Sequence, residues 1–465
     1  MLLYLFHKIR LVEFLSFIDL VIPPFYLIVF FFVAHNIRAR HIEKEPYYKY
    51  FMSGLMVKML GSIAICLVYV FYYGSGDTTN YYSDCLSVSK LFVKNPWQAI
   101  RFTFLPLDWE TWFSFDFDTG WPIYSYDAKA IVVDKLTWPL CFVSFNSFIG
   151  QTMLLSFLCF FPIWRLYKMF LYEFPQLEKE FALSVLFMPS VIFWGSGLLK
   201  DSITFAAIAA FTASLHHILK IRTHIWRNLI YIVLSSALMI FIKPYIFFAV
   251  IPGSLLWLVG FRLSKLSNPL VRMAVTPALL LTTVLSGYLM LKLFGNTLGE
   301  YQVANVLDKA IVTQQDLKQD YYQGASFDIG DFDSSVPSIL GKAPAAINAA
   351  LFRPYIWEAY NPGMIVSSLE NLVLLVITIF LLIKMRFYNL FLLIFKHHIL
   401  FFSVFFSLFF SFSVGLTTSN FGSLVRYKIP AIPFYVASLF IIYHAYKESR
   451  KKVEEPVIEP VNEIT

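Results

Sequence analysis

Charged residues are scarce in this sequence. Only 14% of its 465 residues are Asp, Glu, Lys or Arg, whereas 58% are hydrophobic and 19% are aromatic. In soluble globular domains about a quarter of the residues are charged, so the composition excludes an ordinary soluble globule. The chain is therefore predicted to be a polytopic membrane protein, and we expect no nucleic-acid partner.

Cysteine is also rare, with four residues in the chain. Cys66 and Cys159 lie within apolar stretches, whereas Cys85 and Cys141 fall in a long loop. The latter two could form a disulfide if that loop faces an oxidising compartment. The sequence alone does not show whether they are close enough to do so.

Eleven apolar stretches predict membrane-spanning helices. Each is long enough, or nearly so, to cross about 30 Å of hydrocarbon. The sixth and seventh are short and share the hinge Lys243-Pro244-Tyr245. The expected fold is all-α, with about eleven transmembrane helices and two long, partly helical outer loops. The stretches are centred near Ile28, Ala64, Leu155, Phe187, Ala207, Val233, Ala249, Leu281, Leu374, Ser407 and Leu439.

The distribution of charge predicts the orientation of the chain. Five short loops together hold 16 Lys and Arg residues against 5 Asp and Glu residues, which is typical of cytoplasmic loops. Two long loops hold 9 basic against 16 acidic residues and are expected on the outer side. The five short loops are 36–50, 165–180, 218–228, 261–272 and 384–397, and the two long loops are 74–145 and 295–364.

The predicted spans and loops divide the chain into six parts. In this arrangement both long loops face the exterior and the C-terminal tail faces the cytoplasm. The parts are the N-terminal spans with a basic inner loop (1–73), a first outer loop with amphipathic helices (74–145), a central transmembrane bundle (146–294), a second outer loop (295–364), the C-terminal spans (365–446) and a cytoplasmic polar tail (447–465).

Histidine is nearly absent from the predicted outer face. Eight of the nine histidines fall at or near the inner ends of spans or in inner loops, and only His7 is unassigned. Chemistry on the outer face must therefore use carboxylates, lysines, arginines or tyrosines to move protons and to stabilise charge. A metal site with histidine ligands is not expected on that side.

Several charged residues lie at the outer ends of spans. Asp77 follows the second apolar stretch by a few residues, and Lys200-Asp201 occupies an apex between two spans. Basic residues at membrane depth are energetically costly and usually have a partner or a function. The other basic residues at this level are Lys243, Arg353, Arg426 and Lys428.

Two explanations fit these basic residues. Each can extend to outer-leaflet phosphates or pair with a nearby acid. Candidate pairs are Lys200 with Asp201 and Arg353 with Glu358. Alternatively, the set binds one phosphate at the bilayer surface, with Arg as a planar fork and Lys as a point charge. Because the residues recur at the outer ends of separate hairpins, we favour the phosphate site for the set.

Other carboxylates leave alternatives open. Asp116 and Asp118 form a DxD pattern that could hold a divalent cation with a donor phosphate, although a lone DxD in an acid-rich loop is a weak signal. Asp201 either fixes Lys200 or acts as a second acid that contacts an acceptor. The sequence indicates no partner for Asp19, which lies in the first span.

Four motifs together resemble a known family. They are a first outer loop that opens with Asp77, the hairpin WGSGLLKD at 194–201, the hinge KPY at 243–245 and the turn NFGSLVRYKIP at 420–430. They look like the multispan glycosyltransferases of the GT-C superfamily and the related bacterial polysaccharide polymerases. One departure is an extra span before the family's usual first span.

The resemblance implies a function. In that family the donor is a sugar on a polyprenyl phosphate, and an Asp or Glu near the start of the first outer loop is the catalytic base. By position, Asp77 would have this role. The transfer would take place at the outer face of a bacterial cytoplasmic membrane, once or repeatedly as in a polymerase. The partners would be the polyprenyl-linked donor, a glycan, lipid or protein acceptor, and membrane lipids.

The chemistry of glycosyl transfer fits the same residues. A carboxylate must accept the proton of the acceptor hydroxyl, and fixed cations must stabilise the departing phosphate. An alternative function is a transporter or flippase for a lipid-linked or anionic solute. A transporter typically shows internal repeats and short outer loops. This chain shows no convincing repeat and has two outer loops of more than sixty residues.

Overall fold

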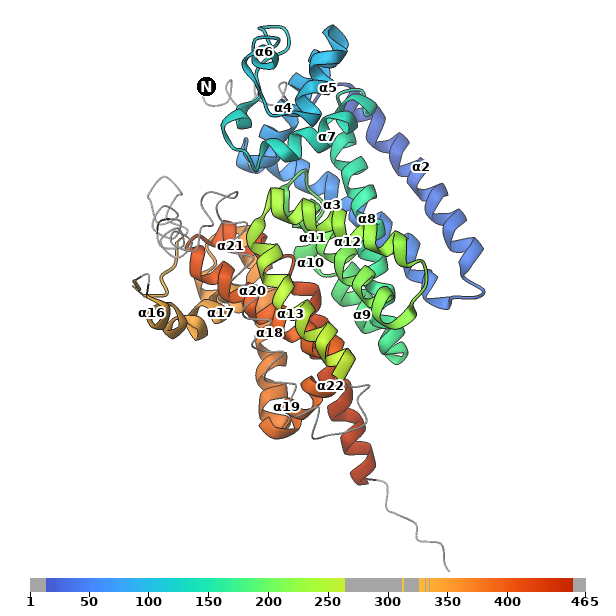
Figure 1. Cartoon of the computed structure of the whole chain (residues 1–465), viewed down its shortest axis with the longest axis vertical. Coiled ribbons are helices and arrows are strands. Elements are labelled where there is room, and N and C mark those ends of the chain that lie inside the picture. Colours follow the sequence, from blue (N-terminus) through green and yellow to red (C-terminus); the bar gives the residue numbers. More distant parts are fainter. Residues whose placement is uncertain (1–13, 264–311, 313–325, 331, 334, 455–465) are drawn as a thin grey trace, which may run out of the picture.

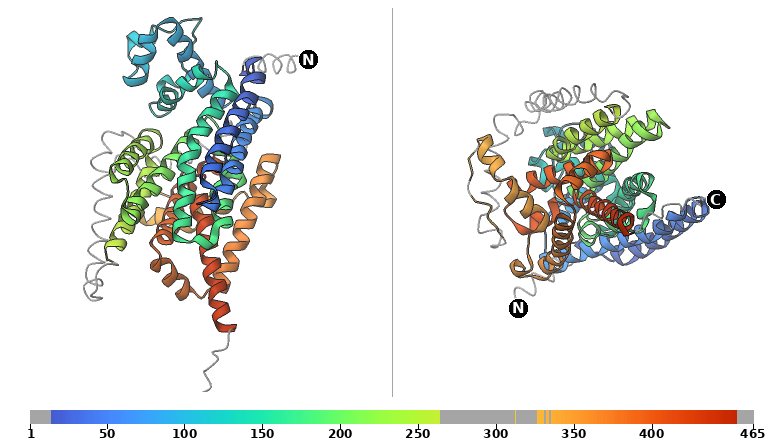
Figure 2. Two further views of the ribbon diagram at one scale, coloured as in Figure 1. Left: turned by 90° about the vertical axis from the view of Figure 1, so that its right-hand side faces the viewer. Right: turned by 90° about the horizontal axis from the view of Figure 1, so that it is seen from below.

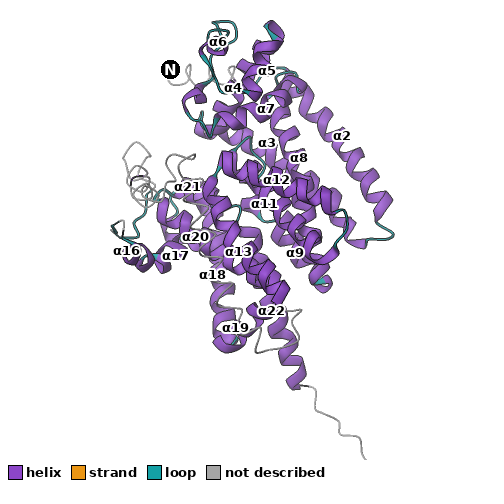
Figure 3. Cartoon of the chain, in the orientation of Figure 1, coloured by secondary structure: helices purple, strands orange, loops and turns teal. Residues whose placement is uncertain are grey.

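The computed structural model describes residues 14–263, 312, 326–330, 332–333 and 335–454. In these residues every regular element is a helix, apart from an isolated β-bridge between Ser326 and Asn420 (Figure 3). The expected all-α fold is thus confirmed. The predicted span near Leu281 and the first part of the second long loop lie outside the described residues.

Eight helical segments of the described chain are long and apolar enough to cross a membrane. Each coincides with one of the predicted stretches, which supports a multi-pass membrane protein. The segments are α2 (Ile18–His41), the run of η1 (Pro46–Tyr48), α3 (Lys49–Val68) and η2 (Tyr69–Tyr73), α8 (Phe148–Glu173), α11 (Lys200–His216) with η5 (His217–Ile221), α12 (Ile225–Ile242), α13 (Pro244–Leu263), α18 (Pro362–Lys384) and α20 (His398–Thr417).

The predicted span near Leu439 is bent. The short helix α21 (Phe421–Tyr427) and the long helix α22 (Ile432–Glu454) meet the criteria for a span only together, and they are inclined by 65° at the break between them. Pro430 lies in this break and has no amide hydrogen to continue α21. The described residues therefore hold eight spans, or nine if the bent pair counts as one, and the predicted number of eleven is not confirmed.

The apolar stretch near Phe187 is not a continuous helix. It forms α9 (Glu178–Leu186) and α10 (Pro189–Trp194), followed by an irregular segment up to Leu199. Pro189 begins α10 and has no amide hydrogen with which to extend α9. Hydropathy alone does not reveal this break, because the residues on both sides of it are apolar.

Buried polar side chains hold the irregular segment. The Lys58 ammonium donates to the carbonyl of Gly195, and Ser156 Oγ donates to the carbonyl of Ser196 at 2.6 Å. Irregular backbone is tolerated at membrane depth only where its polar groups are satisfied inside the protein. Lys58, a charge near the middle of a span, is therefore explained by the backbone of the neighbouring segment.

A group of short helices stands at one end of the bundle, with α22 at the opposite end (Figures 1 and 2). We call residues 74–147 the loop module. In it α4 packs against α7, so the helical character expected for this loop is present. Its elements are α4 (Asp77–Lys94), α5 (Pro96–Phe104), α6 (Trp109–Trp112), η3 (Ile123–Tyr126) and α7 (Ile131–Val143).

The disulfide considered between Cys85 and Cys141 does not form. All four cysteines of the chain are free and buried. The Cys85 sulfur lies 3.2 Å from Thr137 Oγ1, and Cys141 Sγ donates to Asn146 Oδ1 at 3.6 Å. Both thiols therefore contribute to the packing of α4 and α7 as small, weakly polar side chains.

Two buried carboxylates fix parts of the fold. Asp84 accepts hydrogen bonds from the amides of Ile123 at 2.6 Å and Tyr124 at 2.8 Å, which attaches η3 to α4. Asp19 Oδ1 accepts from Ser147 Oγ at 2.7 Å and from the Ile149 amide at 3.0 Å. Asp19 thus caps the N-terminus of α8, where a carboxylate satisfies free amides. This is the partner that the sequence did not indicate.

The remaining helices include α17, which packs against α20, and α16, which packs against α17 (Figure 1). Gly415 lets α17 approach α20 closely, because a Cβ added there would lie 1.9 Å from the carbonyl oxygen of Ala346. The bounds are η4 (Pro175–Leu177), α16 (Val336–Gly341), α17 (Ala343–Phe352), η8 (Ile356–Glu358) and α19 (Phe387–Lys396).

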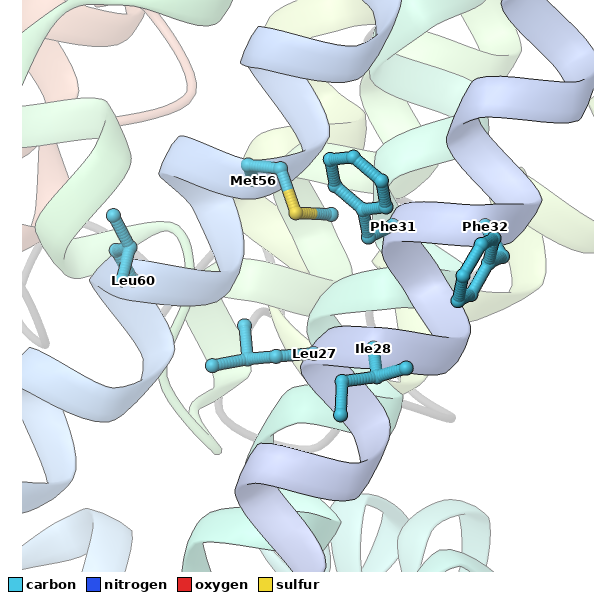
Figure 4. A pocket seen from close by; sticks show the side chains of 6 residues that line it. All are labelled: Leu27, Ile28, Phe31, Phe32, Met56 and Leu60. Carbon is cyan, nitrogen blue, oxygen red and sulfur yellow. The ribbon is translucent and has the colours of Figure 1, made fainter.

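An apolar gap of about 590 Å³ separates part of α2 from α3. Leu27 and Phe31 project from α2, and Met56 projects toward them from α3 (Figure 4). On the same part of α2, Ile28 is 57% exposed and Phe32 is 60% exposed. A surface lined only by apolar side chains suits lipid acyl chains and offers no group for catalysis.

Candidate active site

Four of the charged residues predicted at the outer ends of spans meet in one cluster. Arg426 Nη1 lies 2.6 Å from Asp77 Oδ2, and Arg426 Nε lies 3.3 Å from Asp201 Oδ2. Asp201 also forms an ion pair with Lys243. We call these four residues the central cluster. They come from α4, α11, the junction of α12 with α13, and α21, so the fold brings together distant parts of the chain (Figure 1).

Asp77 stands at the N-terminus of α4, and the residue before it must be small. Gly76 has a φ of 152°, which L side chains rarely adopt, and a Cβ there would lie 2.8 Å from the Tyr69 ring. The amide of Gly76 donates to Thr79 Oγ1 at 2.9 Å, which closes the first turn. The helix dipole favours a carboxylate at this position. The Asp77 side chain remains 39% exposed.

Hydrogen bonds and nearby cations keep Asp77 ionised. The Tyr124 hydroxyl donates to Asp77 Oδ1 at 3.0 Å. Burial by itself raises the pKa of Asp77, but the charge of Arg426, the hydrogen bonds from Arg426 and Tyr124, and the charge of Lys200 together hold this pKa below its ordinary value. At neutral pH Asp77 is therefore a carboxylate, which is the form that can accept a proton.

Asp201 is enclosed between two cations. Its side chain is 2% exposed, and that of its partner Lys243 is 8% exposed. Asp201 lies in the first turn of α11, and Lys243 lies where α12 ends and Pro244 begins α13. Charges this deeply buried depend on their partners, because an unpaired buried charge is strongly destabilising. Asp201 is therefore much less accessible to a substrate than Asp77.

An aromatic ring lies against both cations. The Lys243 nitrogen is 4.4 Å from the centroid of the Tyr427 ring, and the Arg426 guanidinium carbon is 5.2 Å from it. The Tyr69 hydroxyl also accepts a bond from Arg426 Nη1 at 3.4 Å. A ring face stabilises a cation electrostatically, most strongly where water is excluded. These contacts hold Arg426 and Lys243 in place at the edge of the cluster.

Lys200 connects the central cluster to the loop module. Its Nζ lies 3.1 Å from Asp127 Oδ2, so the pairing of Lys200 with Asp201 considered from the sequence is wrong. Burial raises the pKa of Asp127, but the Lys200 charge and hydrogen bonds from Lys200 and two backbone amides bring it below the ordinary value. The charge of Lys200 also contributes to the lowered pKa of Asp77.

The charges of the site are balanced. Three carboxylates, Asp77, Asp127 and Asp201, face the three cations Lys200, Lys243 and Arg426. Each cation already has at least one carboxylate partner. An incoming phosphate would therefore take the place of a carboxylate beside a cation, which frees that carboxylate for another contact.

Two of the predicted phosphate ligands have other partners. Arg353 forms an ion pair with Glu358, and its Nε donates to Glu358 Oε1 at 3.0 Å. The local pairing considered from the sequence is thus confirmed for Arg353. Lys428 is 1% exposed and donates to Asn371 Oδ1 at 2.6 Å. These bonds hold the surroundings of α21 and do not add a cation to the central cluster.

The Asp116 carboxylate of the DxD pattern makes its contacts with neighbouring residues of the loop module. Asp116 forms an ion pair with Lys94, and Asp116 Oδ1 accepts from the amides of Asp118 and Thr119, both at 3.1 Å. The hydrogen bond from Lys94 and those from the backbone lower the pKa of Asp116 to about 2. Within the described residues, no group of three or more His, Cys, Asp or Glu side chains could hold a metal ion.

An apolar cavity of about 380 Å³ lies between η2, α10 and the start of α18. The ring centroid of Tyr73 in this lining is 5.3 Å from that of Tyr69, which bonds Arg426. Glu370 is the acid in the lining, and it accepts a bond from the Ser190 amide at 2.9 Å. The lining also includes Val68, Tyr72, Trp194, Pro362 and Val366.

Sequence reasoning missed three residues of the site, namely Asp127, Tyr69 and Tyr124. Nothing in the sequence distinguishes either tyrosine from the other 25 in a chain that has 27. Asp127 is one of eight acidic residues in the first long loop. The roles of Asp127 and Tyr124 follow only from the packing of the loop module onto the spans, and that of Tyr69 follows from the contact of η2 with α21.

Comparisons with known proteins identify no relative, since no protein-family model, no curated protein and no solved structure matches this chain. A function must therefore be argued from the residues of the site and from their arrangement.

Proposed function

We propose that this protein is an integral-membrane glycosyltransferase whose donor is a sugar or glycan linked to polyprenyl phosphate. Asp77 is the general base, and Lys200, Lys243 and Arg426 bind the donor phosphate. The observation that carries the proposal is the ion pair of Asp77 with Arg426, which is linked through the Tyr69 ring to Tyr73 in the lining of an apolar cavity. A proton acceptor, a phosphate-binding cation and a surface for a lipid tail thus lie within one site.

Asp77 suits the role of base for three reasons. It is partly exposed, its pKa is held low by its neighbours, and it comes from a helix N-terminus that fixes its position. A general base must reach the hydroxyl that it deprotonates, at about 2.6–3.2 Å or through one water. Asp201 is enclosed and has two cationic partners, so we assign it a positioning role toward Arg426 and Lys243.

The cations suit the departing phosphate. Negative charge on the phosphate grows as the glycosidic bond breaks, and fixed cations in a site with little water stabilise that charge. Arg426 offers the planar fork that matches two phosphate oxygens. When the phosphate pairs with Arg426, Asp77 loses its strongest partner, and its affinity for the acceptor proton increases. Donor binding would in this way activate the base.

The apolar cavity suits the lipid part of the donor. Its lining is mostly apolar, with Glu370 and two serines among the lining residues, and runs along η2, α10 and α18. Val366 on α18 is 60% exposed and Tyr72 on η2 is 56% exposed, so neither side chain is covered by the described protein. Apolar side chains that stay uncovered in this way mark a binding surface for an apolar partner. An isoprenoid chain in this cavity would place its phosphate toward Tyr69 and Arg426.

The proposal includes the membrane and the side of it on which the reaction takes place, and the acceptor is a glycan, a lipid or a protein. We place the site on the outer face of a bacterial cytoplasmic membrane, as the charge of the loops predicts. We now assign Arg353 and Lys428 to the support of α21 rather than to the phosphate.

The lipids of cells that lack the protein test the proposal. We expect a polyprenyl-linked saccharide to accumulate in the outer leaflet, where an impermeant glycosidase or oxidant can reach it. Accumulation in a form protected from the impermeant reagent would indicate a flippase instead. An unchanged pool of polyprenyl-linked saccharides would contradict both functions.

A further inference from the structure

A polar cavity lies far from the central cluster. Its volume is about 260 Å³, and it lies between the C-terminal part of α8, the start of η5 and the N-terminal part of α12. Helix α8 begins beside the loop module, and Arg165 is roughly 25 Å along it from Phe148. The lining consists of Arg165, Lys168, His217, Arg227 and Tyr231.

Arg165 is a fixed cation in this cavity, and its bonds go to neutral groups. Its Nη2 donates to Asn228 Oδ1 at 2.7 Å and to Ser214 Oγ at 3.2 Å. Its guanidinium carbon lies 4.4 Å from the centroid of the Tyr231 ring. Its Nη1 is buried and has no hydrogen-bond partner among the described residues. A buried donor on a charged group is costly to leave unsatisfied, so Arg165 has capacity for an anionic ligand.

The other charged groups around the cavity leave it positive. Lys168 Nζ lies 3.6 Å from Glu45 Oε1. Glu173, on the same helix, is paired with His216 at 2.8 Å and with Lys220 at 3.3 Å. Arg227 and Arg165 add two positive charges, so one carboxylate faces three permanent cations.

His217 supplies a further donor when protonated. Its Nδ1 lies 2.9 Å from the Ala213 carbonyl, so this nitrogen carries the hydrogen. The second ring nitrogen, Nε2, is then free to accept or, in the protonated form, to donate. The cavity therefore combines two guanidinium groups, an ammonium and an imidazole around one space.

The surroundings of the cavity favour a lipid headgroup over a dissolved anion. On α12, Trp226 is 81% exposed, Ile230 is 59% exposed and Val233 is 65% exposed. These apolar side chains are not covered by the described residues, and they lie on the same predicted span as the lining residues Arg227 and Tyr231. Trp at the end of a span is typical of the membrane interface. Basic pockets between transmembrane helices on the cytoplasmic side are suited to anionic headgroups.

We propose that this cavity binds the phosphate of an anionic phospholipid headgroup in the leaflet opposite to the central cluster. Arg165 and Arg227 contact the phosphate oxygens, Lys168 adds a third positive charge, and the His217 ring borders the same space. The acyl chains lie along the exposed apolar side of α12. This lipid site does not depend on the proposed glycosyltransferase activity.

Lipid binding to the purified full-length protein tests this site. The protein is titrated in detergent with phosphatidylglycerol, with phosphatidylcholine, and with inorganic phosphate, and its unfolding temperature is recorded. We expect phosphatidylglycerol alone to raise the unfolding temperature. Arg227→Gln should weaken the apparent affinity for phosphatidylglycerol about fivefold or more, because one basic side chain near a membrane surface contributes about that factor. Arg227 is exposed, so its replacement leaves the fold intact.

Lys179→Gln is the matched control. Lys179 is exposed on α9 and belongs to the same predicted cytoplasmic side, but it does not line the cavity. This variant should bind phosphatidylglycerol as the unmodified protein does. Equal affinities for phosphatidylglycerol in Arg227→Gln and Lys179→Gln would overturn the site. An equal response to inorganic phosphate would overturn the assignment to a lipid.

Discussion

Arg426 and Asp77 form an ion pair in which Nη1 lies 2.6 Å from Oδ2. The pair joins α21, near the C-terminus, to the first residue of α4. Since Arg426 also contacts Asp201, one guanidinium group fixes two carboxylates of very different exposure. This arrangement separates a carboxylate that can meet a substrate from one that positions the cations.

Arg426→Lys tests whether the planar fork is required. Lysine keeps the charge but cannot contact Asp77 and Asp201 or two phosphate oxygens in the same geometry. A hydrogen bond to a charged group contributes about 1.5–3 kcal/mol, so kcat/KM for a polyprenyl-linked donor should fall about 10- to 100-fold. The amount of protein in the membrane should not change.

Arg353→Lys is the matched comparison, since it makes the same exchange at a residue that pairs with Glu358. We expect a smaller loss of activity from it than from Arg426→Lys. Equal activities of the two variants would show that the fork of Arg426 has no special role, and that both arginines only anchor the protein.

Asp201→Asn tests the positioning role of the enclosed carboxylate. It leaves Lys243 and Arg426 as buried cations without this partner, and breaking a buried pair costs about 3–5 kcal/mol. The unfolding temperature in detergent should therefore fall markedly. In the double variant Asp201→Asn with Lys243→Met both charges are removed, and much of the stability should return. A double variant no more stable than Asp201→Asn would contradict the pairing.

Asp134 and Asp84 predict an unusual dependence of stability on pH. Asp134 is fully buried between α4 and α7, and no described residue donates a hydrogen bond to its carboxylate, so in its protonated form it donates to Asp84. Burial raises the pKa of Asp84 to about 6. Burial, the charge of Asp84 and the hydrogen bond to Asp84 raise the pKa of Asp134 well above its ordinary value. Both carboxyl groups therefore bind protons more tightly in the folded protein than in the unfolded chain.

A carboxyl group whose pKa is higher in the folded protein than in the unfolded chain stabilises the folded protein at low pH. This stabilisation is lost as the pH rises through the pKa of the folded state. For Asp84 the window extends from its ordinary value of 3.8 to about 6. The unfolding temperature of the loop module should thus decrease between pH 4 and 7. Asp134→Asn, which is neutral at every pH, should raise the unfolding temperature at pH 7 and weaken this dependence. Asp118→Asn, at an exposed site, should leave both unchanged. A pH profile of Asp134→Asn identical to that of the unmodified protein would refute the explanation.

Most of the membrane spans and the charged residues at their outer ends could be predicted from the sequence. Long apolar runs identify helices such as α8 and α20 because hydrocarbon thickness fixes their length. Asp77, Asp201, Lys243 and Arg426 stood out because charge at membrane depth requires a reason. The stretch around Phe187 was misread because Pro189 and the support from distant Lys58 leave no trace in mean hydropathy.

Partners within the site could not be predicted in the same way. Arg353 and Arg426 look alike in the sequence, and only the fold shows that one binds a near neighbour and the other binds residues hundreds of positions away. Asp127 became the partner of Lys200 because the loop module folds back onto α11. From the sequence, the adjacent Asp201 is an equally good candidate for the partner of Lys200. Only the tertiary packing shows that the partner is Asp127.

Turnover by Asp77→Asn tests the central claim most directly. Asparagine keeps the size of the side chain and can still accept a bond from Tyr124, but it cannot take a proton from an acceptor hydroxyl. The protein is reconstituted in vesicles with a polyprenyl-linked sugar donor and an acceptor, and product formation is measured with the unfolding temperature as a check on folding. We predict that the rate falls about 100-fold or more while the unfolding temperature stays close to that of the unmodified protein. A near-normal rate in Asp77→Asn would contradict the assignment of Asp77 as the base.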